Sequence, residues 1–198
     1  MQIINDILDV SKLNSGKMNL NDDCFSLQEI KDSIHNIIGR RINDKNQTLN
    51  INITSDVPKF IVADKQKLMQ ILMNLVSNSY KFTKSHGEIH VIIKLDQHDK
   101  LKVSVIDNGC GISRTNIDKL FKAFTQLNFS EEITGSGLGL VICKKLAILM
   151  GGDINVESCE HKGSTFSFTI AFKNYEEVER EIESKSVSLL NKNEGKIS

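Results

Sequence analysis

Tryptophan is absent from the 198-residue chain, and Pro58 is its single proline. The four cysteines are scattered, with no C-x-x-C pair and no histidine at ligand spacing, so a zinc site is disfavoured and free thiols in a reducing compartment are expected. No apolar run reaches the length of a membrane span, and the start of the chain lacks the pattern of a signal peptide. We therefore expect a cytoplasmic segment without membrane contact.

The chain also has no formal net charge, because 25 lysine and arginine residues balance 25 aspartate and glutamate residues. A neutral chain has no broad electrostatic attraction for nucleic acid or anionic lipid, and we expect neither as a partner. Hydrophobic residues make up 39% of the chain, which is typical of a globular protein. The length suits one ordinary domain with an appendage, or two very small domains.

Hydrophobic periodicity indicates an alternation of helices and strands. Amphipathic helices are predicted over residues 3–13, from Ser26 onward with Glu29 completing a capping box, over residues 64–84, after Ser113 and over residues 138–149. Strands are predicted over residues 48–54, 88–95, 101–106, 153–158 and 164–172. This order predicts an α+β fold, a two-layer α/β sandwich whose mixed, mostly antiparallel sheet carries helices on one face, plus an N-terminal helix.

Polar side chains gather on one flank of the long helix predicted over residues 64–84. Asn74, Asn78 and Lys81 fall within about 60° of one another at 100° per residue. An amide oxygen is a hard ligand for Mg²⁺, and a lysine offers a point charge to phosphate. The flank is therefore a candidate cation and phosphate site, although an ordinary solvated helix face explains the same residues.

An aspartate ends the strand predicted over residues 101–106. Asp107 is in phase with the inward side chains of that strand, where a carboxylate is costly unless it is paired. Gly109 and Gly111 follow it and permit close backbone approach to a flat ligand. This grouping suits an adenine pocket, and an Asp-Asn-Gly turn is the alternative.

A third motif, residues 135–140 (GSGLGL), precedes a predicted helix. Glycines at a helix start expose backbone N–H groups to phosphate, and a flexible glycine-rich loop is the alternative. The G-x-G-x-G spacing does not match the dinucleotide-binding fingerprint, and the chain has no P-loop motif.

Together, these motifs resemble the catalytic ATP-binding domain of sensor histidine kinases, above all of the hybrid type. Residues 69–83 (MQILMNLVSNSYKFT) resemble its N box, and residues 105–112 (VIDNGCGI) its first glycine box. Residues 120–126 (LFKAFTQ) resemble its F box, and residues 135–140 its second glycine box. Residues 1–20 are similar to the second helix of the dimerisation and phosphotransfer hairpin with its linker, residues 21–173 to the ATP-binding domain, and residues 174–198 form an acidic and polar linker.

The resemblance implies ATP and Mg²⁺ as cofactors and assigns roles to individual residues. Asn78 would supply the Mg²⁺ ligand, Phe82 would stack on adenine, and Thr165 would lie near the base. The residues implied in nucleotide binding are Asn74, Asn78, Lys81, Phe82, Asp107, Gly109, Gly111, Ile112, Gly135, Ser136, Gly137, Leu138, Gly139, Leu140 and Thr165, of which Asn74, Asn78 and Lys81 would also be catalytic. Phe121 and Phe124 would be the F-box aromatics, and an amphipathic helix packed on its own core explains them equally well.

Asn74 decides between reaction types. The gyrase-like members of the superfamily carry a water-activating glutamate at this position, whereas an amide cannot act as a general base. This favours phosphoryl transfer to a histidine over hydrolysis. The alternatives are an ATP-binding regulatory module that signals by lid closure and a gyrase-like ATPase.

The acceptor of the phosphoryl group is not evident. None of the five histidines has the Glu or Asp and the Arg-Thr-Pro-like turn that follow the family's acceptor, and the first hairpin helix would precede Met1. The resemblance therefore implies an acceptor-histidine helix in cis or in trans, a response-regulator receiver domain as partner, and a homodimer formed through the N-terminal helix in a full-length protein.

Overall fold

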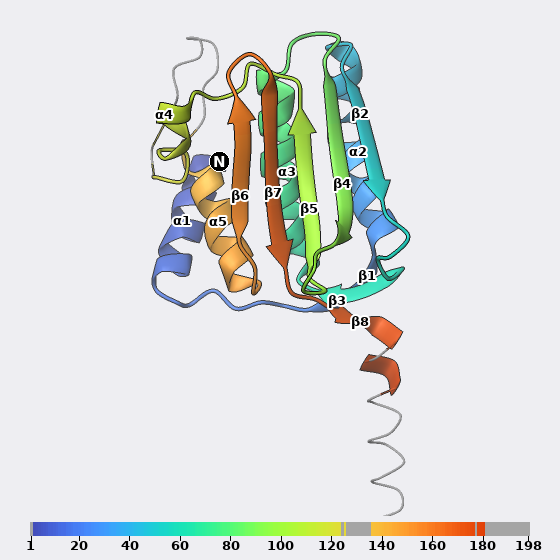
Figure 1. Ribbon diagram of the computed structural model, residues 1–198. Coiled ribbons are helices and arrows are strands. Elements are labelled where there is room, and N and C mark those ends of the chain that lie inside the picture. The colour runs from blue at the N-terminus through green and yellow to red at the C-terminus, as the bar shows by residue number, and fades with distance from the viewer. Residues whose placement is uncertain (1, 124, 126–135, 177, 181–198) are drawn as a thin grey trace, which may run out of the picture.

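The computed structural model describes residues 2–123, 125, 136–176 and 178–180, and they form a five-stranded sheet backed by helices (Figure 1). The helices are α1 (Gln2–Asn14), α2 (Leu27–Asp44), α3 (Lys65–Phe82), α4 (Arg114–Ile117) and α5 (Gly139–Leu149). The strands are β1 (Asp23–Ser26), β2 (Thr48–Ile53), β3 (Phe60–Ala63), β4 (Glu88–Leu95), β5 (Leu101–Asp107), β6 (Ile154–Cys159), β7 (Gly163–Ile170) and β8 (Lys173–Asn174).

The large sheet has the strand order β2-β4-β5-β7-β6. β2 runs parallel to β4, and the other neighbours are antiparallel, so the sheet is mixed and mostly antiparallel. Helices α2, α3 and α5 cover one face and leave the other open (Figure 1). The predicted two-layer α/β sandwich is confirmed.

The central helix α3 is positioned by a fully buried apolar stripe. Leu68, Ile71, Leu72, Leu75 and Val76 lie between α3 and the sheet. Asp64 caps the start of the helix, where its carboxylate accepts from the Lys67 amide at 2.9 Å. The flank that carries the polar residues is thereby held in one orientation.

Helix α2 begins with the predicted capping box. The Ser26 hydroxyl accepts from the Gln28 amide at 3.1 Å, and the Glu29 carboxylate accepts from the Ser26 amide at 3.3 Å. Both orphan donors at the helix start are thus satisfied, as the sequence indicates.

A second, three-stranded sheet was not predicted. Strands β1, β3 and β8 pair in the order β1-β3-β8 at the lower end of the sandwich in Figure 1. Each has four residues or fewer, which is too short for an alternating pattern to be visible in the sequence. The sheet closes the end of the core where α3 begins.

The segment after Ser113 is less helical than predicted. The helix α4 ends at Ile117, and turns follow it. Leu120 is buried and Phe121 packs against the core, which agrees with the core-packing interpretation of Phe121. Phe124 lies outside the described residues.

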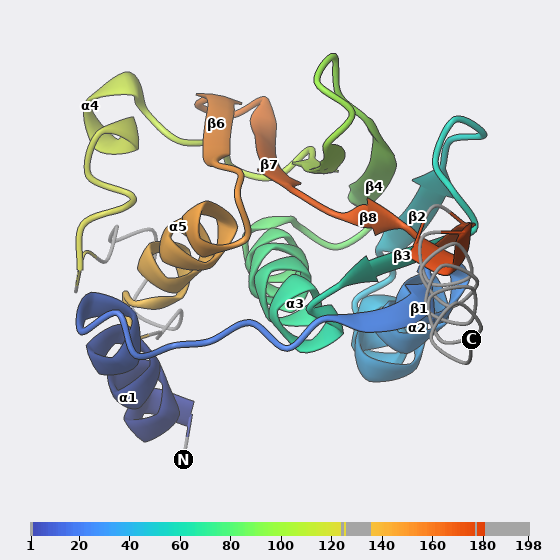
Figure 2. The same cartoon turned by 90° about the horizontal axis from the view of Figure 1, so that it is seen from below.

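Helix α1 lies beside α5, away from α2 (Figure 2). It packs Val10 and Leu13 against the core and leaves Ile4, Ile7 and Leu8 exposed. Within the described part of the chain, no helix is both long enough and apolar enough to cross a membrane.

Candidate nucleotide site

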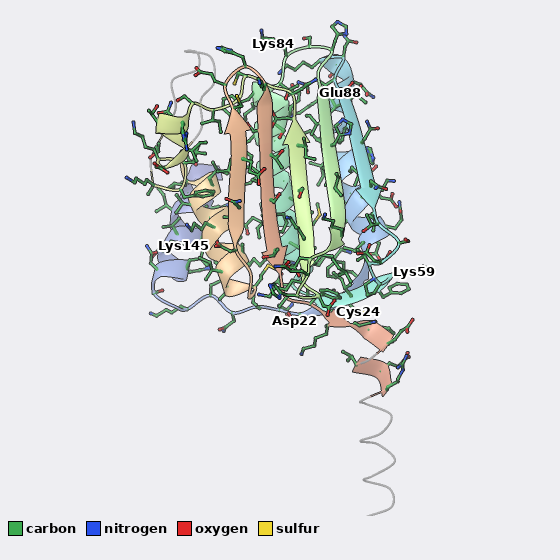
Figure 3. The ribbon with its side chains drawn as sticks, viewed as in Figure 1. Asp22, Cys24, Lys59, Lys84, Glu88 and Lys145 are labelled. Atoms are coloured by element: carbon green, nitrogen blue, oxygen red, sulfur yellow. The ribbon has the colours of Figure 1, made fainter. Side chains whose placement is uncertain are left out.

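The candidate site lies at the end of the sandwich where α3 and β5 finish. Lys84 and Glu88 flank the turn from α3 into β4 at this end, whereas Asp22 and Cys24 lie at the opposite end (Figure 3). Asp107 is the last residue of β5, and Phe82 is the last residue of α3. The Asp107 carboxylate, which the sequence predicts to bind adenine, therefore lies near the end of the predicted N box.

Asp107 is buried on the helix-covered face of the sheet, with 8% of its surface exposed. Its Oδ2 accepts from the Ser79 hydroxyl at 2.9 Å, and its Oδ1 accepts from the Gly109 amide at 3.0 Å. Burial raises the pKa of the Asp107 carboxyl, and hydrogen bonds with the backbone of Gly109, the side chain of Ser79 and the backbone of Ser164 oppose that rise. The carboxylate is thus held from two sides in a partly desolvated position.

The first glycine box packs against the end of α3. A Cβ on Gly109 would lie 2.6 Å from the Phe82 carbonyl oxygen, and the Cys110 amide donates to that oxygen at 3.1 Å. Gly111 has φ +68°, and a Cβ there would clash with the Cys159 carbonyl oxygen. The sequence predicted that these glycines permit close approach of the backbone to a flat ligand. In the structure, both glycines lie close to protein backbone. Ile112 is buried in the core.

The second glycine box meets α3 about two turns before Phe82, at Asn74. Gly139 opens α5, and a Cβ there would lie 3.3 Å from Asn74 Oδ1. Burial raises the pKa of the neighbouring Cys143 thiol to about 12, an effect that a hydrogen bond with the Asn74 side chain partly opposes. Asn74 therefore touches the start of the helix whose N-terminal amides were predicted to face phosphate.

The two predicted glycine boxes thus converge on α3, which carries the third motif. The second glycine box contacts Asn74, Asp107 contacts Ser79, and the first glycine box contacts Phe82. Asn74 and Asn78 are half-buried, and Lys81 is exposed, as a flank that receives a polar ligand requires.

The other described residues of the second glycine box lie at or just before the start of α5. Ser136 Oγ accepts from the Leu138 amide at 3.3 Å, Gly137 has φ +67°, and Leu138 is buried. Leu140 packs against the core. Gly135 lies outside the described residues.

Thr165 is not beside Asp107. It pairs with Ile106 and Glu157, and it lines a shallow pocket on the open face of the sheet with Lys102, Ser167 and Thr169. Side chains alternate along a strand. The buried Ser164, which pairs with Asp107, therefore has its side chain on the helix-covered face, whereas the next residue, Thr165, does not. Thr165 therefore lies on the open face of the sheet, and its expected place near the base stays a prediction.

Ser79 is the contact that the sequence did not single out. It is 2% exposed and lies one turn after Leu75 in the buried stripe. A hydroxyl in an otherwise apolar stripe was the available signal, since a buried hydroxyl needs a hydrogen-bond partner.

Helix α1 touches the site from outside. Ser136 donates to Asp6 Oδ2 at 2.8 Å, and Gln70 Nε2 of α3 donates to Asp9 Oδ2 at 2.8 Å. One hydrogen bond thus links α1 to the second glycine box, and the other links it to the helix that carries the N box.

The site offers amide rather than carboxylate oxygens to a metal ion. Among the described residues, no group of three or more His, Cys, Asp or Glu side chains could hold a metal. The half-buried amides of Asn74 and Asn78 are hard oxygen donors, which suit a Mg²⁺ ion that keeps water and phosphate ligands.

Comparison with known proteins identifies the family. The model of the histidine kinase-, DNA gyrase B- and HSP90-like ATPase family matches residues 63–174, which hold α3, β4, β5, α5, β6 and β7. The chain belongs to this ATPase family. Within this family, the relatives and solved structures described below are histidine kinases.

The similar curated proteins are hybrid-type sensor kinases. The chain is 41% identical over 176 residues to hybrid signal transduction histidine kinase B of Dictyostelium discoideum. The matched region covers 86% of this chain and 9% of that protein. It is 39% identical over 176 residues to the signal transduction histidine-protein kinase BarA of Escherichia coli K12, with 86% and 19% covered. The chain therefore spans less than a fifth of the length of either relative.

Solved structures agree with this family assignment. Full-length ShkA in complex with AMPPNP matches with a TM-score of 0.78 and 26% identity, covering 87% of this chain and 36% of ShkA. The catalytic domain of the histidine kinase ThkA matches with a TM-score of 0.65 and 29% identity, covering 76% of this chain and 97% of that domain.

Proposed function

We propose that this domain binds Mg·ATP along α3 and transfers the γ-phosphoryl group to a histidine of a helical hairpin. The observation that carries the proposal is the convergence of the two glycine boxes on Asn74, Ser79 and Phe82 of the helix that carries the third motif. The base would lie at the Asp107 end of α3, and the phosphates would lie between the Asn74–Asn78 flank and the start of α5.

Each residue of the site then has a chemical task. Asp107 accepts a hydrogen bond from the exocyclic amine of adenine, and Phe82 stacks on the ring. Lys81 offers its charge to phosphate, and the amides at Gly137 and Gly139 face phosphate at the start of α5. Asn78, with Asn74 one turn earlier, would hold Mg²⁺, which when bound neutralises charge on the phosphate oxygens.

Transfer is favoured over hydrolysis by the side chain at position 74. An amide neither accepts a proton near neutral pH nor activates water, so the bound γ-phosphoryl group waits for a stronger nucleophile such as an imidazole. Positioning the two reactants is then the main contribution of the protein to the rate.

The partners follow from this reaction. The phosphoryl group moves to a histidine on a helical hairpin in cis or in trans, and from there to the receiver domain of a response regulator. The exposed Ile4, Ile7 and Leu8 of α1 form an apolar face that supports homodimerisation through this helix in a longer protein. Sedimentation of the chain with and without Ile7→Glu tests the dimer.

Phosphoryl transfer is tested with an added acceptor. The chain is incubated with γ-labelled ATP, Mg²⁺ and a helical hairpin that carries a histidine followed by Glu. We expect acid-labile, base-stable label on the hairpin and only slow release of phosphate without it. Asn78→Asp should reduce the labelling rate at least tenfold, whereas Asn155→Asp on the open face of the sheet is the matched control.

The other outcomes separate the alternatives. Bound ATP with no label on any acceptor would replace the kinase by an ATP-binding regulatory module. Rapid Mg²⁺-dependent phosphate release without an acceptor would indicate a gyrase-like ATPase. Unchanged labelling by Asn78→Asp would overturn the assignment of the metal ligand.

A further inference from the structure

Ser79 and Asp107 form a buried hydrogen bond at the end of α3 where the proposed function places the base. Both side chains are buried, with 2% and 8% of their surfaces exposed, and 2.9 Å separates Ser79 Oγ from Asp107 Oδ2. Among the described residues, Ser79 supplies the one side-chain hydrogen bond to this carboxylate. The hydroxyl proton is therefore committed to Asp107.

A carboxylate held in this way still has room for a ligand. Its two oxygens offer about four lone-pair sites, and the Gly109 amide, the Ser79 hydroxyl and the Ser164 backbone take three at most. The remaining sites accept hydrogen bonds and cannot donate them. A 6-aminopurine presents a donor to such a group, whereas a 6-oxopurine presents an acceptor.

Loss of the hydroxyl would change this chemistry. Burial favours the neutral carboxyl, as the raised pKa of Asp107 indicates, and the hydrogen bond from Ser79 favours the ionised form. A neutral carboxyl carries an O–H donor that can satisfy a 6-oxo group. Without the bond, the Gly109 amide still holds Oδ1, but Oδ2 has no side-chain donor that fixes its direction.

We propose that Ser79 is a positioning residue that makes the site select 6-aminopurine nucleotides, because its hydroxyl holds Asp107 Oδ2 as an acceptor facing the base. The inference rests on the ATP-binding function proposed above. It adds a residue outside the predicted set of nucleotide contacts.

The test compares three nucleotides on the same variant. Dissociation constants of ATP, purine ribonucleoside triphosphate, which lacks the 6-amino group, and inosine triphosphate are measured by titration calorimetry. In Ser79→Ala we expect ATP binding to weaken about five- to tenfold, the size of one lost hydrogen bond, and binding of the 6-unsubstituted nucleotide to stay within about twofold. Ser77→Ala, a half-buried serine on the same helix, is the matched control.

A double-mutant cycle separates positioning from a structural effect. If Ser79 acts through Asp107, adding Ser79→Ala to Asp107→Asn should change the ratio of the ATP and 6-unsubstituted dissociation constants by less than about twofold. The inference is overturned if Ser79→Ala alone weakens all three nucleotides equally, or if adding it to Asp107→Asn changes the ratio as much as it does in the wild-type chain. Failure of the wild-type chain to bind any of the three would instead overturn the proposed function.

Discussion

The Ser136 hydroxyl donates to Asp6 Oδ2 at 2.8 Å and joins two residues that lie 130 positions apart. The bond ties α1 to a residue three positions before the start of α5. A 13-residue helix is marginal alone in water, so α1 depends on such contacts and on the packing of Val10 and Leu13.

Asp6→Ala should loosen α1. Loss of one partly buried hydrogen bond costs about 1 kcal/mol, so we expect amide hydrogen exchange in α1 to accelerate about fivefold. Exchange in α3 should stay unchanged, and Asn5→Ala, exposed on the same helix, is the control. If Asp6→Ala and Asp9→Ala both leave the exchange of α1 unaltered, these hydrogen bonds do not hold the helix.

Two glycine substitutions should change stability in opposite directions. Gly39 lies within α2 with open space around its Cβ position, so Gly39→Ala should stabilise the chain by about 0.5–1 kcal/mol. Gly111 has φ +68° and faces the Cys159 carbonyl, so Gly111→Ala should destabilise it by about 2 kcal/mol or more. Urea unfolding measures both, and a common sign would contradict the backbone geometry.

Cys143 should give stability a pH dependence above neutrality. Burial raises the pKa of this thiol from 9.0 to about 12, so the unfolded chain ionises before the folded chain does. The contribution is intact below about pH 9, and the free energy of unfolding should fall as pH rises from about 9 toward 12. Cys143→Ala removes the effect, so the slope difference between the two proteins isolates it. Parallel slopes would refute the burial of an un-ionised thiol.

Asp107→Asn should weaken ATP binding without unfolding the chain. An amide can still accept from Gly109, but it loses the charge that strengthens a bond to the adenine amine, worth about 1.5–3 kcal/mol. Titration calorimetry should show a loss of at least about tenfold. Thr165→Ala is the contrasting variant, because its side chain lies on the open face and should leave affinity within about twofold. A larger loss for Thr165→Ala would support its predicted place near the base.

Patterns along single elements made much of the fold predictable. The stripe of α3 and the Ser26 capping box are local, and each was found where the sequence placed it. The small sheet was not predictable, because β1, β3 and β8 are held by pairing between distant short segments and carry no periodicity of their own.

The site shows the same division. Residue types and spacing single out Asn74, Asp107 and Gly139, and the structure brings Asp107 and Gly139 to the helix that carries Asn74. The face occupied by Thr165 follows from the alternation with Phe166 and Phe168, which point into the core, whereas its expected place near the base came from the family resemblance alone. Ser79 needed a tertiary contact, because a serine between apolar residues does not reveal its partner.

The contacts of α3 also fix the distance between the two ends of the proposed site. The rise from Asn74 to Phe82 along the helix is about 12 Å, and the Asp107 contact at Ser79 lies between them. A single residue inserted between Asn74 and Ser79 would turn one contact by about 100° relative to the other. The separation between the base end and the phosphate end of the site is therefore set by the length of one helix, so loops can lengthen on either side of α3 without changing the size of nucleotide that fits.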